Sequence, residues 1–430
     1  MSRKFALGLA VFSAHSAKNS ARQPSFWPKK GILPCLRYYY IAEKGGKSMQ
    51  ISKFMTPEII FGNQSIGQVG ESLRRLGASR VFLVSDPGVV KAGWVERIIH
   101  YLQQQHLDYH LWTNVTANPK DYEIHAGIAA YRAGECNAIL GVGGGSAIDA
   151  AKAIALLATN EGSIVQYEGV DRILHPLPPM VMVPTTAGSG SEVSQFSIIV
   201  DSERKVKMTI VSKSLIPDIA IIDPQTLMTK DRQLTANTGM DVLTHAIESY
   251  ISLAATPLTE VHSLQAMRLI AQHLRPSAAS QYNACAKQAM AMASLQAGIA
   301  FSNAILGAVH AMSHQLGGFL DAPHGEVNAI LLPHVLEYNY IAAPEKYRQI
   351  AECLGENTSG LSTHDASRLA LKAVKDLAND LDVPHSLSAI GLHPEQIELL
   401  SSLALLDVCM TTNPRDMSVQ DVAALFRQAL

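Results

Sequence analysis

The sequence predicts an α/β N-terminal domain built on a parallel sheet, followed by an all-helical C-terminal domain. Three observations carry this prediction. Short apolar, β-branched runs alternate with helical stretches up to about residue 232, strand signals stop from about residue 233, and a length of 430 residues is enough for two or three domains. We therefore assign residues 49–232 to the first domain and residues 233–430 to the second.

Four apolar runs carry the strand prediction, and each ends in a turn or a helical stretch. They are residues 80–85, 138–142, 180–184 and 219–223. Helices are predicted at residues 95–104 and, after a run of glycines, at 147–158. Strands that alternate with helices pair in parallel and are covered on both faces, so we expect a buried sheet. In the second half we expect helix breaks at Pro276, Pro323 and Pro333.

The composition narrows the class of protein. The chain is 47% hydrophobic and 17% charged, which supplies a core and argues against general disorder. A net charge of −2 and an aromatic content of 6% disfavour a nucleic-acid partner. No apolar run reaches the ~18–20 residues of a membrane span, so we expect no membrane partner. The five cysteines are scattered without a CxxC pair, which is typical of a reducing compartment and argues against a thiolate metal site.

The first 48 residues differ from the rest of the chain. They contain nine Lys or Arg and one Glu, a charge of +8, which leaves −10 on the other residues. We interpret residues 1–48 as an unstructured extension, or as the result of a start codon placed ahead of a true start at Met49. A targeting peptide is the alternative, because the segment is basic and bears serines.

A glycine-rich run, GVGGGS at residues 141–146, closes a predicted strand and opens a predicted helix. Backbone N–H groups at such a turn can hold a phosphate. The run differs from the Rossmann fingerprint because Ser146 replaces the third glycine, and because the strand-end acid, Asp86, precedes it. A second run, TTAGSGSE at 185–192, follows the strand at 180–184. The two turns together predict a Rossmann-like dinucleotide site with a different topology.

Ligand-type side chains recur at helical spacing in the second half. Asp241 and His245 stand four residues apart, as do His310 and His314, and His324 follows on a predicted loop. One carboxylate with two or three imidazoles suits Fe²⁺ or Zn²⁺. Spacing alone leaves open whether His310 or His314 is the ligand. A dinucleotide beside such a metal favours alcohol–carbonyl redox chemistry, with the metal as Lewis acid and the nicotinamide as hydride acceptor.

With these motifs, the sequence resembles the iron-containing (group III) alcohol dehydrogenases from about Phe54 to the C-terminus. The stretches that carry the resemblance are GGGSAIDAAKAIA (143–155), PTTAGSGSEV (184–193), LTANTGMDVLTHAIESY (234–250), LGAVHAMSHQLGGF (306–319) and PHGEVNAILLPHV (323–335). The resemblance implies an NAD-dependent alcohol dehydrogenase that acts with Fe²⁺, or Zn²⁺ in its place, on small primary alcohols, diols or their aldehydes. It also implies a cytoplasmic homodimer or larger homo-oligomer.

The resemblance further implies roles for individual residues. The implied metal ligands are Asp241, His245, His310 and His324, with His314 close by, either as a residue that supports a ligand or as a proton relay. The implied dinucleotide contacts are Asp86, Gly143, Gly144, Gly145, Ser146, Asp149, Thr185, Thr186, Ser189 and Lys207. A carboxylate at Asp86 would repel a 2′-phosphate and so favour NAD over NADP.

Two other functions are compatible with parts of this pattern. Glycerol dehydrogenases and dehydroquinate synthases share the two-part arrangement and use zinc, typically with fewer histidines. A scaffold without activity is the other alternative, but such a chain should have lost a ligand or a loop glycine. This sequence retains the expected metal ligands and the loop glycines.

Overall fold

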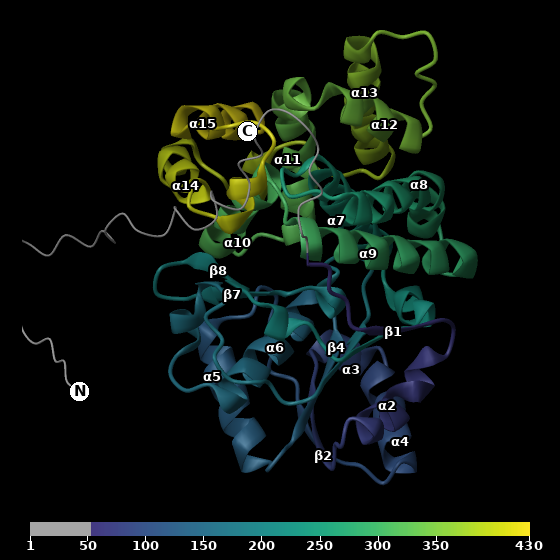
Figure 1. Ribbon diagram of the computed structural model, residues 1–430, viewed down its shortest axis with the longest axis vertical. Helices are drawn as coiled ribbons and strands as arrows, with labels where there is room; N and C mark the ends of the chain where they lie inside the picture. The colour runs from purple at the N-terminus through teal and green to yellow at the C-terminus, as the bar shows by residue number, and fades with distance from the viewer. Residues whose placement is uncertain (1–52) are drawn as a thin grey trace, which may run out of the picture. The chain divides into compact units, whose positions relative to one another are not determined.

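A six-stranded parallel sheet forms the centre of the first half of the molecule (Figure 1). The structure is a computed structural model that describes residues 53–430. Residues 1–48, which we interpreted as an extension, lie outside the described residues. The strands are β1 (Glu58–Phe61), β2 (Arg80–Val84), β3 (Asp108–Trp112), β4 (Ala138–Gly143), β6 (Met180–Pro184) and β9 (Ile219–Ile222). Their order is β1-β9-β6-β4-β2-β3, and every pairing is parallel, which confirms the predicted sheet.

Helices cover both faces of this sheet. They are α2 (Val69–Arg75), α3 (Pro87–Lys91), α4 (Trp94–Gln104), α5 (Asp121–Ala133) and α6 (Gly145–Thr159). Alternation along β2 divides the core: Phe82 and Val84 pack with side chains of α5 and α6, whereas Val81 and Leu83 pack with α2 and α4. Burial on both faces explains why the strands are almost continuously apolar.

A second, three-stranded sheet was not predicted. It consists of β5 (Gly169–Val170), β7 (Phe196–Asp201) and β8 (Val206–Val211) in the order β5-β8-β7, with β7 and β8 antiparallel. The hairpin turn between β7 and β8 contains no glycine or asparagine, so the usual hairpin signal is missing. Instead Lys205 adopts a positive φ of 55°.

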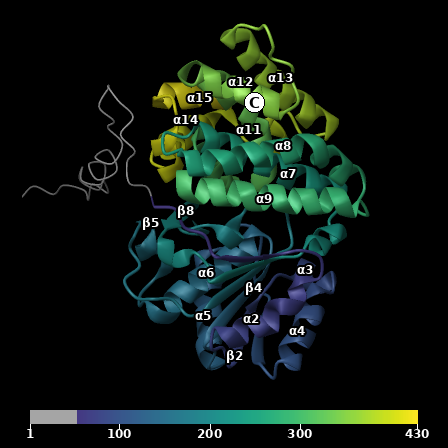
Figure 2. The same cartoon turned by 45° about the vertical axis from the view of Figure 1, so that its right-hand side comes forward.

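The second half is helical, as predicted, and no strand follows β9 in the described chain. Its helices are α7 (Arg232–Ile251), α8 (Pro257–Ala279), α9 (Ala284–Ala304), α10 (Ala308–Leu320), α11 (His324–Asn339), α12 (Pro344–Cys353), α13 (Thr363–Asp380), α14 (Ile397–Ala404) and α15 (Val419–Gln428). Figure 2 shows α7, α8 and α9 side by side above the sheet. The predicted division between residues 232 and 233 falls at the start of α7, and it stays a prediction because one compact unit contains both halves.

Three local predictions were wrong. Pro276 lies inside α8 and Pro333 inside α11, so neither breaks its helix. A proline removes only one helical hydrogen bond, and the buried side chains around both prolines keep their helices packed. His324 was expected on a loop, but it is the first residue of α11, directly after Pro323.

No single helix of residues 53–430 has both the length and the apolar composition to cross a membrane. The pair α9 and α10, which is bent by 99° at its break, passes the same criteria only when the two helices are taken together.

Candidate functional site

The glycine run lies where β4 passes into α6. Gly143 ends the strand, Gly144 is the N-cap residue, and α6 begins at Gly145. No side chain among residues 53–430 caps the N-terminus of this 15-residue helix, so its first N–H groups remain available. A helix N-terminus with free amides binds anions such as a pyrophosphate.

Other predicted dinucleotide contacts surround this turn. A Cβ atom added to Gly143 would lie 3.1 Å from Asp86 Oδ2, and one on Gly145 would lie 2.7 Å from Ser189 Cβ. One on Gly144 would lie 3.4 Å from Thr186 Oγ1. The glycines therefore allow these three side chains, from two separate segments, to approach the backbone of the turn.

The remaining three predicted contacts, Thr185, Asp149 and Lys207, are buried. Thr185 donates its N–H to Gly143 O at 2.8 Å, and neither its hydroxyl nor Asp149 Oδ1 has a hydrogen-bond partner in the described residues. Burial raises the pKa of Asp149 to about 6 and lowers the pKa of Lys207 to about 8. Lys207 packs against α10, where a Cβ on Gly317 would lie 2.5 Å from Lys207 Cε. The structure thus places Lys207 on the side of the site that faces the helical half.

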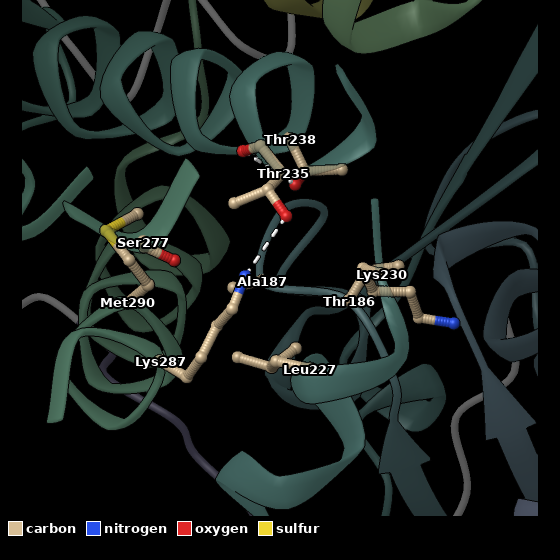
Figure 3. Close-up of a pocket in the computed structure, with 9 residues that line it drawn as sticks. All are labelled: Thr186, Ala187, Leu227, Lys230, Thr235, Thr238, Ser277, Lys287 and Met290. Atoms are coloured by element: carbon tan, nitrogen blue, oxygen red, sulfur yellow. Dashed lines mark hydrogen bonds between the residues drawn. The ribbon is translucent and has the colours of Figure 1, made fainter. Parts of the chain in front are cut away.

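A cleft between the two halves includes Thr186 in its lining (Figure 3). The residues that line it come from the loops after β6 and β9 and from α7, α8 and α9: Thr186, Ala187, Leu227, Lys230, Thr235, Thr238, Ser277, Lys287 and Met290. Lys287 is almost completely buried and donates to Thr235 Oγ1 at 3.2 Å. Among these residues only Thr186 was predicted from the sequence, because the cleft exists only once the halves pack together.

The four expected metal ligands come from three helices. Asp241 and His245 lie on α7, His310 on α10 and His324 on α11. The Nε2 atoms of His310, His245 and His324 lie 3.7, 3.9 and 4.0 Å from Asp241 Oδ1. These separations are too long for hydrogen bonds and are of the size expected between Asp241 and a second ligand of the same divalent ion. The ligand atoms of Asp241, His245 and His310 are buried and lie within 4.8 Å of one another, while the His324 side chain is 26% exposed. Nitrogen and oxygen donors of this kind fit Fe²⁺ or Zn²⁺.

Glu248 holds the His310 ring in place. Its carboxylate lies 2.6 Å from His310 Nδ1 and accepts the N–H of Val309 at 2.7 Å. A carboxylate can only accept, so His310 Nδ1 carries the proton and Nε2 is the atom left to face Asp241. Glu248 follows Asp241 by seven residues on α7, a same-face spacing that could have been found in the sequence.

Asn328 was also missed, although it follows His324 by four residues on α11. Its Nδ2 donates to Asp241 Oδ1 at 2.7 Å and lies 3.2 Å from both His310 Nε2 and His324 Nε2. Acceptor atoms of three expected ligands thus converge on one donor group. Convergence of that kind is also what a cation requires, so the residues fit a metal.

The charges in this cluster are strongly coupled. Burial alone would raise the pKa of Asp241, but the neighbouring histidines, His245 first, hold that pKa below its usual range. Burial lowers the pKa of His245 to about 4. For His310, burial also acts downward, but the carboxylates of Asp241 and Glu248 outweigh it and raise the pKa to about 9. The carboxylate therefore stays ionised, as a metal ligand must be.

The structure separates the two histidines that spacing left open. His310 faces Asp241, whereas His314 Nδ1 lies 2.9 Å from Asp407 Oδ2. The His314 ring stacks on that of His324, with centroids 5.5 Å apart. His314 therefore lies beside the expected ligands. Asp407 was not identified from the sequence, and no local spacing signal points to it.

A parallel-sheet half with an anion-binding turn, joined to a helical half in which three histidines surround a buried aspartate, defines a metal-dependent oxidoreductase that uses a dinucleotide. Comparison with known proteins places it more narrowly. Residues 56–224 match the iron-containing alcohol dehydrogenase model, and residues 235–430 match the C-terminal model of the Fe-containing alcohol dehydrogenase family. The chain belongs to the iron-containing alcohol dehydrogenase family, which confirms the resemblance and the enzyme class.

Individual relatives agree with this assignment. The chain is 44% identical to 1,3-propanediol dehydrogenase of Klebsiella pneumoniae, over 89% of this chain and all of the relative. It is 39% identical to NAD-dependent methanol dehydrogenase of Bacillus methanolicus, over 88% of this chain and 99% of the relative. A crystal structure of 1,3-propanediol oxidoreductase superposes with a TM-score of 0.87 at 44% identity, covering 89% of this chain and all of that one. These comparisons do not favour the glycerol dehydrogenase or dehydroquinate synthase alternative.

Proposed function

We propose that this enzyme interconverts small primary alcohols or diols and their aldehydes, with NAD as hydride carrier and Fe²⁺ held by Asp241, His245, His310 and His324. The observation that carries the proposal is the buried cluster of Asp241, His245 and His310, with His324 Nε2 from a third helix 4.0 Å from Asp241 Oδ1. The substrate class follows the relatives named for 1,3-propanediol and methanol. When bound, the ferrous ion supplies a Lewis acid for the alcohol oxygen, and the nicotinamide accepts the hydride.

On the dinucleotide side, the N-terminus of α6 binds the pyrophosphate through the free amides of Gly145 and Ser146. The other residues that complete this binding site are Gly143, Gly144, Asp149, Thr185, Thr186, Ser189 and Lys207. Asp86 accepts hydrogen bonds from the adenosine ribose and repels a 2′-phosphate, which selects NAD. We expect Asp86→Ala to lower the ratio of the KM for NADP to the KM for NAD by about tenfold or more. An unchanged ratio would contradict this role of Asp86.

On the metal side, Asp241 supplies the negative charge, and the three imidazoles supply neutral nitrogen ligands. Glu248 fixes the tautomer of His310, and Phe301 stacks on His245 with ring centroids 4.5 Å apart. His314, next to the cluster but bonded to Asp407, moves the alcohol proton toward solvent.

The proposal is tested on protein purified without oxygen and reconstituted with Fe²⁺ or Zn²⁺. We expect NAD-linked turnover of small primary alcohols or diols that depends on the metal. His245→Ala should lower the bound metal and abolish turnover. His334→Ala, a change of the same kind on α11 away from the cluster, should leave both unchanged. Metal loading without turnover of any alcohol or aldehyde in the panel would refute the substrate class.

We further propose a homodimer or larger assembly in the cytoplasm. Apolar side chains that are more than half exposed, Leu253, Leu258 and Val261, lie near the start of α8 and support self-association. Sedimentation equilibrium measures the assembly, and a single-chain mass at micromolar concentration would contradict it. Cell fractionation tests the location.

A further inference from the structure

The pair formed by His314 and Asp407 is built more firmly than a chance contact. Both side chains are about 95% buried, and they join α10 to a turn 93 residues further along the chain. The second carboxylate oxygen, Asp407 Oδ1, accepts the N–H of Cys409 at 2.8 Å at the start of the short helix η9 (Val408–Thr412). Asp407 is therefore held by its own turn while it holds His314.

This hydrogen bond determines the tautomer of the neutral His314 ring. An ionised carboxylate can only accept, so the proton of a neutral His314 lies on Nδ1 and the lone pair on Nε2. The reverse tautomer would set lone pairs of nitrogen and oxygen against each other. The ring stacks on His324 and meets His310 edge-on, with centroids 5.5 and 6.0 Å away. In the neutral ring, the lone pair of Nε2 thus belongs to a ring that lies against two expected metal ligands.

We propose that Asp407 is the positioning residue that keeps His314 ready to accept the substrate proton; this inference rests on the proton role proposed for His314. In alcohol oxidation the hydroxyl proton moves to His314 Nε2 while the hydride moves to NAD⁺, which leaves the aldehyde. The resulting imidazolium is stabilised by the Asp407 carboxylate and then releases that proton to water.

The same groups allow one other interpretation, a second cation site made of His314, Asp407 and Cys409, whose donor atoms lie within 4.8 Å of one another. Two features oppose it. The 2.9 Å hydrogen bond already occupies Nδ1, and burial together with the Asp407 charge holds the pKa of the Cys409 thiol well above its usual range. A thiolate ligand is therefore disfavoured.

The test compares Asp407→Asn with the wild-type holoenzyme. The asparagine amide can donate to Nδ1, so the proton of His314 should shift to Nε2. Nitrogen-15 spectra of the histidine rings in the Zn²⁺-loaded protein report this change without any turnover. With Fe²⁺ we expect kcat to fall by about 10- to 1,000-fold, KM for NAD to stay within twofold, and metal content to remain one ion per chain. Asp407→Glu should restore part of kcat.

Three controls separate the outcomes. Asp223→Asn removes another buried carboxylate that caps a short helix, and it should leave the His314 spectrum unchanged. Asp407→Asn should add little to the loss caused by His314→Ala. If His314→Ala alone turns over like wild type, the proton role fails, while the spectrum still tests the positioning. An unchanged His314 spectrum in Asp407→Asn, or two bound ions per wild-type chain of which the variant loses one, would overturn the inference. If Asp407→Asn does not fold, the spectrum and kcat of Asp407→Glu decide.

Discussion

Replacement of Glu248 by glutamine removes the charge that holds the His310 ring while it keeps the shape of the side chain. In the structure this carboxylate accepts from Val309 N at 2.7 Å and His310 Nδ1 at 2.6 Å, both in buried surroundings. A glutamine keeps one accepting oxygen and turns an NH₂ group toward the remaining donor. One buried bond to a charged group is lost and one donor is left unpaired, so we expect the free energy of unfolding to fall by about 2–4 kcal/mol.

Metal affinity should fall as well, because the ring that presents Nε2 is no longer fixed. Loss of such an outer partner typically lowers affinity about 10- to 100-fold. Competition between the protein and a coloured chelator for Zn²⁺ measures the affinity, and urea unfolding of the metal-free protein measures the stability. Glu398→Gln, at an exposed ion pair with Arg427, is the matched control and should change neither. If Glu248→Gln binds Zn²⁺ as tightly as wild type, the carboxylate does not position His310.

Three other changes test the electrostatics and the backbone. Burial raises the pKa of Glu192 from 4.5 to about 7, so the folded state binds this proton more tightly than the unfolded state and stability falls by about 3 kcal/mol as pH rises from 4.5 to 7. Glu192→Gln should remove that fall. If urea unfolding shows that variant and wild type lose the same stability between pH 5 and pH 8, the assignment to Glu192 is refuted. Ile305 has a φ of 59°, a conformation that glycine adopts more easily than alanine. The Ile305→Gly protein should therefore be more stable than the Ile305→Ala protein by about 1–3 kcal/mol, the reverse of the usual order. Calorimetry of the two variants measures this difference. A Cβ on Gly318 would lie 2.7 Å from the backbone of Lys207, so Gly318→Ala should destabilise by about 1–3 kcal/mol, whereas Gly67→Ala, with ordinary contacts, should change little.

Local chain chemistry accounts for the parts of the site that the sequence predicted. The turn at Gly143–Ser146 follows from a buried apolar strand, three glycines and an alanine-rich helix, all within one short stretch of chain. Asp241 and His245 share a helix face because 3.6 residues make one turn. The same periodicity places Glu248 on that face, so this residue was within reach of a more complete search.

The parts that were missed depend on distant segments. The hairpin of β7 and β8 carries Lys207 but has no glycine or asparagine at its turn, so no local signal marks it. The prolines at 276 and 333 stay within helices because packing on the helical core outweighs one missing hydrogen bond. Local preferences are worth little per residue, and tertiary burial can override them.

The sequence by itself determined the fold class, the anion-binding turn and the pairs of ligand-type side chains, because each depends on strand or helix periodicity within a few residues. Only the tertiary structure decided that His310 faces Asp241 while His314 turns to Asp407. Both histidines lie on α10 one turn apart, and local spacing treats them alike. They differ in the partners that packing brings to them, Glu248 from 62 residues away and Asp407 from 93. Contacts across such separations are set by how helices pack against one another, and that arrangement is a property of the whole chain.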